Sequence, residues 1–122
     1  MSMRRWILAA SAATVMWAAA SEVQEAKKLI AAKKYDDAIV ALEKAQKVQP
    51  KSPEVKKAFA EAYVGQGDTF MYNEALPPRM KYPQALKSYR KALEYDKTHK
   101  QALAQIKTIE DIYKSMGRPV PQ

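Results

Sequence analysis

The segment AIVALEKAQKVQP at residues 38–50 has a counterpart 47 residues further along the chain, ALKSYRKALEYDK at residues 85–97. Both segments carry alanine at their first and eighth positions and a large residue at the fifth, which is Leu42 in one and Tyr89 in the other. Positions i, i+4 and i+7 share one face of an α-helix. The segments therefore predict two similar helices, in which the alanines let helix axes approach and the large residue fills the space between them.

The repeat extends to both sides of these segments, as a search for internal periods should test first. One set of helical positions recurs with the same offset of 47 residues, and a related set lies 34 residues earlier. The three sets are Glu22, Glu25, Ala26 and Leu29; Lys56, Phe59, Ala60 and Tyr63; and Leu103, Ile106, Lys107 and Glu110. The second interval is thus 13 residues longer than the first, which places an insertion at residues 69–81.

With this period the chain resembles the tetratricopeptide repeat family, whose helix–turn–helix unit is about 34 residues long. The resemblance rests on Phe59-Ala60-x2-Tyr63 in a first helix, and on Ala38-x3-Leu42 with Pro50 and Ala85-x3-Tyr89 in second helices. It covers roughly residues 21–115 apart from the insertion. The chain departs from the family pattern at Glu22 and Lys56, where a large aromatic is common, at Lys97, where proline is expected, and at Lys107, which replaces a small residue. The resemblance implies an all-α, antiparallel helix-pair repeat of the α-solenoid type, with about two and a half repeats.

We expect five helices in a domain at residues 21–117, followed by a tail at residues 118–122. Their predicted ranges are about 21–33, 36–48, 53–66, 83–95 and 100–115. Ser21 with Gln24 and Thr98 with Gln101 have the spacing of capping boxes at helix starts. Pro83 suits the first turn of the fourth helix.

Residues 1–20 precede this domain and have the pattern of a secretory signal peptide. Arg4 and Arg5 come first, an uncharged run follows from Trp6, and Ala18-Ala19-Ala20 offers a small-x-small cleavage site. The alternative is an uncleaved anchor helix at residues 6–21, which would span about 24 Å of a hydrocarbon layer roughly 30 Å thick. That shortfall favours cleavage after Ala20, and the protein would then be exported to the periplasm or cell envelope.

The insertion, TFMYNEALPPRMK, is unusually apolar for a connector. Its large apolar residues are Phe70, Met71, Tyr72, Leu76 and Met80. Pro77-Pro78 predicts extended chain rather than helix at that point, although residues 69–76 could continue the preceding helix. Two interpretations stay open: an Ω-like loop that packs on its own repeat, or an arm that sets partner choice and contributes little to the fold.

The composition excludes several kinds of site. The 122 residues contain no cysteine, one histidine and three glycines, so thiolate chemistry, a multi-histidine metal site and a phosphate-binding glycine loop are all excluded. No nucleophile–base set can be recognised, and His99 falls in a turn where a solvated side chain is expected. We therefore expect no catalytic residue, no metal, no cofactor and no small-molecule substrate.

The charge is strongly basic, with 21 lysines and arginines against 13 acidic residues and a formal net charge of +8. A solvated helical face explains most of this excess. The alternative is a docking surface for an acidic protein, a cell-wall polymer or an anionic lipid headgroup. Nucleic acid is not expected, because no groove-reading motif is present.

The family resemblance implies a protein-binding role through the inner surface of the first helix of each repeat. The matching positions in this chain are Val23, Lys27, Ile30, Glu54, Lys57, Glu61, Val64, Thr108 and Asp111. We therefore expect a non-enzymatic adaptor or scaffold that binds a protein partner in an envelope complex. The alternative is a membrane-anchored structural accessory subunit that keeps residues 6–21 as a helix.

Overall fold

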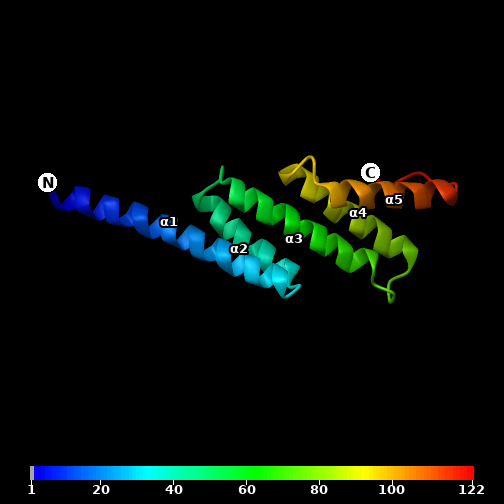
Figure 1. Cartoon of the computed structure of the whole chain (residues 1–122), viewed down its shortest axis with the longest axis horizontal. Coiled ribbons are helices and arrows are strands. Elements are labelled where there is room, and N and C mark those ends of the chain that lie inside the picture. Colours follow the sequence, from blue (N-terminus) through cyan, green and yellow to red (C-terminus); the bar gives the residue numbers. More distant parts are fainter. Residues whose placement is uncertain (1) are drawn as a thin grey trace. The chain divides into compact units, whose positions relative to one another are not determined.

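The structure, a computed structural model, describes the backbone of residues 2–122 and the side chains of residues 17–122. Within this part of the chain it contains five α-helices and no β-strand (Figure 1). The helices are α1 (Ser2–Ala31), α2 (Tyr35–Val48), α3 (Pro53–Met71), α4 (Pro78–Tyr95) and α5 (Lys100–Ser115). The predicted all-α class is therefore confirmed. By its internal contacts the chain divides into two compact units, residues 1–58 and 59–122, and each is described by itself.

Helix α1 does not begin at Ser21, so the expected capping box with Gln24 is wrong. The helix passes through Ser21 because neither glycine nor proline interrupts residues 17–31, and alanine, the best helix former, fills residues 18–20. The proposed signal peptide falls mostly on residues whose side chains lie outside the described part. Its cleavage stays a prediction.

The end of α1 is closed by a Schellman motif rather than by helix up to residue 33. The Lys34 amide donates to the Leu29 carbonyl at 2.8 Å, and the Lys33 amide donates to the Ile30 carbonyl at 3.0 Å. Lys33 has a φ of 61°, the left-handed conformation that this motif needs and that glycine adopts most easily. A lysine at this position keeps the turn but adds conformational strain.

The first unit buries the small–large–small face that the sequence predicts. Helix α1 packs against α2. The buried residues of α2 are Ala38, Ile39, Ala41, Leu42 and Ala45. On α1 the buried residues are Ala19, Val23 and Ala26, which follow one another at helical spacing along a single stripe.

The second unit is built around Tyr89 of α4, which is 0% exposed. Its ring lies against the backbone of α3 at Gly67, where an added Cβ atom would stand 2.6 Å from the ring. Only glycine leaves room for the ring at this position. This explains why a residue that disfavours helix stands inside α3. The buried cluster contains Val64, Ala85, Leu86, Tyr89, Ala92, Ala102, Ile109 and Tyr113.

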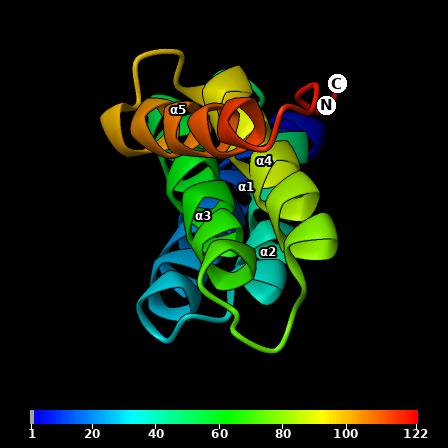
Figure 2. The ribbon, with the colours of Figure 1, turned by 90° about the vertical axis from the view of Figure 1, so that its right-hand side faces the viewer.

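The insertion at residues 69–81 is not an Ω-like loop, because most of it is helix. Relative to the hairpin of α1 and α2, it adds six residues to the end of α3, three to the connector and four to the start of α4. The connector of residues 72–77 is therefore short, and Figure 2 shows it joining the ends of α3 and α4. Phe70 and Met71 pack against the buried cluster, as does Tyr82 just after the insertion, so the segment belongs partly to the core.

The prolines of α4 do not act as expected. Pro77 is the N-cap and Pro78 the first residue of the helix, where a missing amide hydrogen costs nothing, so the prediction of extended chain at Pro78 is wrong. Pro83, expected in the first turn, lies inside the helix instead. It cannot donate to the Arg79 carbonyl. Helix α4 nevertheless continues, because Ala85, Leu86 and Tyr89 are buried just beyond it.

Helix α5 is capped by His99 and not by Thr98, so the second capping box is also wrong. The His99 Nδ1 atom accepts a hydrogen bond from the Ala102 amide at 3.3 Å. Thr98 donates its hydroxyl and amide hydrogens to Asp96, at 3.1 and 3.2 Å. The half-buried histidine thus replaces the usual serine or threonine as the acceptor at the helix start.

Candidate protein-interaction surfaces

The predicted binding residues of the first unit are mostly at the surface. Lys27 on α1 and Glu54 and Lys57 at the start of α3 are exposed, and Ile30 is half-buried. Val23 is only 4% exposed, so it is a core residue and not a binding residue. The reason is that α1 packs on α2 along the stripe that contains Val23.

The second unit contributes the other predicted inner-face residues. Glu61, Thr108 and Asp111 are exposed, whereas Val64 is 5% exposed and belongs to the buried cluster. Val64 therefore has to be removed from the predicted surface, since its side chain is covered within its own unit. The role of the exposed residues in partner binding stays a prediction.

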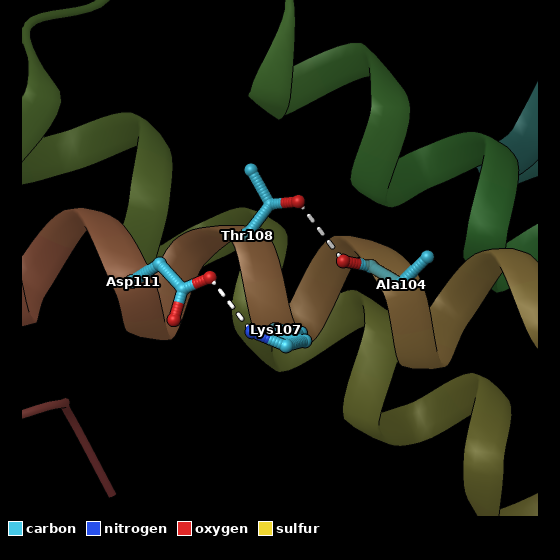
Figure 3. Close-up of polar contacts among 4 residues, drawn as sticks. All are labelled: Ala104, Lys107, Thr108 and Asp111. Atoms are coloured by element: carbon cyan, nitrogen blue, oxygen red, sulfur yellow. Dashed lines mark hydrogen bonds and ion pairs between the residues drawn. The ribbon is translucent and has the colours of Figure 1, made fainter.

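The exposed face of α5 is held by hydrogen bonds within the helix. Lys107 Nζ lies 2.9 Å from Asp111 Oδ2, and the Thr108 hydroxyl donates to the Ala104 carbonyl at 3.0 Å (Figure 3). The hydrogen bond and the negative charge of Asp111 raise the pKa of Lys107. Pairing four residues apart fixes both side chains on one solvent-facing strip, although exposed pairs of this kind contribute little stability.

The apolar residues of the insertion divide into two groups. Phe70 and Met71 are half-buried against the cluster of the second unit, and Leu76 in the connector is half-buried too. Tyr72 and Met80 are exposed, and the Tyr72 hydroxyl accepts a hydrogen bond from Gln105 Nε2 at 2.6 Å. The prediction of an arm that contributes little to the fold is therefore wrong for the insertion as a whole. Tyr72 and Met80 remain available to a partner.

A polar network ties the three helices of the second unit together. Asp68 on α3 accepts from the Tyr89 hydroxyl at 2.5 Å and from Gln101 Nε2 on α5 at 2.9 Å. Burial, followed by the hydrogen bond to Asp68, raises the pKa of the Tyr89 phenol far above its ordinary value. The phenol is therefore a fixed hydrogen-bond donor, and we assign this network a structural role.

Three aromatic rings stack beside this core. The ring of Phe59 lies 4.4 Å from that of Tyr95, centroid to centroid, and the Tyr63 ring lies 5.9 Å from Tyr95. All three rings are within 13° of parallel. The stack joins α3 to the end of α4 and holds Tyr63 in a defined orientation.

Tyr63 forms one wall of a groove between α3 and α4 that the sequence did not indicate. We call it the α3–α4 groove, and its volume is about 330 Å³. Its lining residues are Tyr63, Gln66, Gln84, Lys87, Ser88 and Lys91. The four lining residues from α4 recur at helical spacing, which is visible in the sequence. In the sequence alone, this spacing of polar residues looks the same as an ordinary solvent-exposed helix face.

The tail after α5 also packs against its unit, although no role was predicted for it. Gly117, with a φ of 66°, closes α5 with a second Schellman motif, in which the Arg118 amide donates to the Tyr113 carbonyl at 3.0 Å. Val120 then packs against the buried cluster, and Arg90 Nη1 donates to the Pro121 carbonyl at 2.8 Å.

The described residues offer neither a metal site nor a membrane-spanning helix. They contain no cluster of three or more histidine and acidic side chains able to hold a metal ion. Within the same residues, no helix combines the length and the apolar character needed to cross a bilayer.

Among known protein families, a tetratricopeptide repeat model matches residues 29–69 of the chain. The matched segment runs from the end of α1 through α2 and nearly all of α3. No curated protein and no solved structure matches the chain. The match confirms the predicted resemblance to the tetratricopeptide repeat family for residues 29–69.

Proposed function

Taking as premise that residues 29–69 form a tetratricopeptide repeat, we propose that this protein is an exported, non-enzymatic adaptor that scaffolds an envelope complex. Tetratricopeptide repeats generally mediate protein–protein interaction, because stacked helix pairs present an extended surface. The observation that carries the proposal is the match of the family model to residues 29–69, a segment that contains α2 and most of α3. Exposed Glu54 and Lys57, three residues apart on α3, offer such a surface.

A photo-crosslinking residue in place of Lys57 tests this surface in the native host. Lys56 is the matched control, since it is an equally charged, exposed neighbour that points about 100° away around α3. We expect the Lys57 position to give one reproducible adduct with a protein of the envelope and the Lys56 position to give little or none. Equal labelling from both positions, or no adduct from either, would contradict the proposal.

Export is tested by the mass of the mature protein. We propose cleavage after Ala20, so that the native protein begins at Ser21. Intact-mass spectrometry of protein from its host measures this directly. A protein that still contains residues 1–20 would contradict cleavage and favour the second candidate.

The second candidate is a structural accessory subunit that keeps residues 6–21 as part of α1. One observation favours it: Ala19, Val23 and Ala26 form a single buried stripe, and cleavage after Ala20 would divide it. Trp17, 82% exposed on the same helix, would then be free to contact a neighbouring subunit or the surface of a membrane. Retention of Trp17 in the native protein is the decisive measurement.

A further inference from the structure

The α3–α4 groove combines positive charge with a fixed polar floor. Helix α4 carries five cationic residues and only one acidic residue, Glu94. Two of the cations, Lys87 and Lys91, lie four residues apart and both line the groove. Side chains at this spacing point the same way along a helix, so their ammonium groups approach one site together.

The two ammonium groups can take up a new anion at little cost. Lys87 has no acidic partner among the described residues, and it is exposed. Lys91 Nζ lies 3.0 Å from Glu94 Oε2, with 45% and 62% of the two side chains exposed. Such exposed pairs contribute little, so Lys91 can exchange Glu94 for another carboxylate with a small loss.

The floor and wall of the groove are held in place. Ser88 is 5% exposed, and its hydroxyl donates to Gln66 Oε1 at 2.9 Å, which links α4 to α3 beneath the lysines. Tyr63 is oriented by its stack with Phe59 and Tyr95. A site whose walls are already fixed loses less entropy when a ligand binds.

From this arrangement we infer that the α3–α4 groove binds an acidic segment of a protein partner, with a Glu or Asp carboxylate between Lys87 and Lys91. The aliphatic stem of that residue would lie along the Tyr63 ring, and its carboxylate would accept charge-assisted hydrogen bonds from the two ammonium groups. The inference rests on the proposed protein-binding function and names the chemistry of the partner.

An acidic peptide fits better than a membrane surface. Binding in the plane of a membrane needs a broad apolar face beside the cations. On α4 the large apolar residue exposed to solvent is Met80, two turns away from Lys87. The groove volume of about 330 Å³ is also in the range that accommodates a few side-chain groups.

The test measures binding of a fluorescently labelled peptide of alternating Glu and Gly, with a Gln–Gly peptide as the neutral control. The double variant Lys87→Gln, Lys91→Gln should bind the acidic peptide about tenfold more weakly, because two charge-assisted contacts are lost. The matched control is Lys44→Gln, Lys47→Gln on α2, which removes the same charge from exposed positions. It should change the affinity less than about twofold, since those lysines lie outside the groove and act only by screened long-range attraction.

A third variant probes the exchange at Lys91. Glu94→Gln removes the competing carboxylate and should tighten peptide binding, whereas Glu43→Gln on α2 should have little effect. Equal losses in the two lysine double variants would show attraction by net charge alone and overturn the inference. So would vesicles of phosphatidylserine and phosphatidylcholine that bind more tightly than the peptide and depend on Lys87 and Lys91.

This test and the crosslinking test fail separately. Suppose that the Lys57 crosslink forms equally in the wild type and in the Lys87→Gln, Lys91→Gln variant, and that the peptide shows no preference for the groove. Only the inference about the groove is then contradicted. If the peptide binds at the groove but no protein is crosslinked at Lys57, the surface proposed for the adaptor falls instead.

Discussion

Leu42 on α2 and Tyr89 on α4 stand at equivalent positions, 47 residues apart, and both are completely buried. Around Leu42 the first unit uses only apolar neighbours on its own helix: Ala38, Ile39, Ala41 and Ala45. Around Tyr89 the second unit needs Gly67, which makes room for the ring, and Asp68, which accepts from the hydroxyl. The repeat spacing fixes where the large residue lies. It leaves open how the opposing helix accommodates it.

The helix ends differ in the same way. Positions 33 and 67 are 34 residues apart and therefore equivalent in the repeat, yet α1 ends at Ala31 while α3 continues to Met71. Packing of the Tyr89 ring on Gly67 and the bonds to Asp68 both require α3 to continue. The longer hairpin is thus a consequence of the larger core residue.

Deletion of residues 69–81 makes the second hairpin as short as the first and should have the largest effect. It removes Phe70 and Met71 from the core and the Tyr72–Gln105 hydrogen bond. We expect the protein to stay helical but to lose about 2–4 kcal/mol of unfolding free energy. Urea unfolding followed by circular dichroism measures the loss, and Phe70→Ala alone should give part of it. An unchanged midpoint would mean that the insertion contributes nothing to the fold.

Gly67→Ala tests the fit of the tyrosine ring directly. The new methyl group would lie 2.6 Å from the ring, so we expect a loss of about 1–3 kcal/mol despite the better helix propensity of alanine. In a Tyr89→Leu background, which copies Leu42, the same substitution should become neutral or stabilising. The double-mutant cycle is read from thermal or urea unfolding. Equal costs in the two backgrounds would show that the ring is not what requires the glycine.

Alkaline pH should affect the free energy of unfolding through Tyr89 but not through Leu42, because only the tyrosine can ionise. Burial and the hydrogen bond to Asp68 raise the pKa of the folded Tyr89 phenol, so it keeps its proton where the unfolded phenol loses it, above about pH 10. Stability from this group is complete below that pH and falls by about 1.4 kcal/mol per pH unit above it. Tyr89→Phe should lack this slope when wild type and variant are unfolded in urea at matched pH values. Parallel pH dependences would refute the assignment.

The two Schellman motifs give the smallest expected effect. Lys33→Gly should stabilise the protein by about 1 kcal/mol, since glycine adopts a positive φ without strain. Gly117→Ala should destabilise it by a similar amount, although nothing lies within 4 Å of the new Cβ atom. Both changes are measured by the shift in melting temperature. Shifts in melting temperature of the same sign for the two substitutions would contradict the shared turn geometry.

The buried faces were predictable from sequence, and the helix ends were not. Ala38, Ala45, Ala85 and Ala92 are all buried, as the spacing of alanine around a large residue required. Ser21, Thr98 and Pro83 carry local signals that the structure overrides. The reason is that a capping or proline effect is worth about 1–3 kcal/mol, which packing of a few buried side chains exceeds.

The candidate surface was predictable only in part. Lys57 and Glu61 are exposed as the repeat register implied, but Val23 and Val64 are covered. A helix in a repeat contacts more than one neighbour, so a single register position does not distinguish the groove from the core. The α3–α4 groove depends on Ser88 and Gln66 meeting across helices, a contact between residues 22 positions apart that periodicity does not encode.

The hydrogen bonds from Gln101 to Asp68, from Gln105 to Tyr72 and from Arg90 to Pro121 each join residues 31 or 33 positions apart. Closing such long loops costs more entropy than closing one helical hairpin, so we expect these bonds to form late in folding. Contacts absent from the transition state slow unfolding without accelerating folding. The second unit would then fold at a speed set by its local hairpins, while its lifetime would depend on the polar bonds that close last.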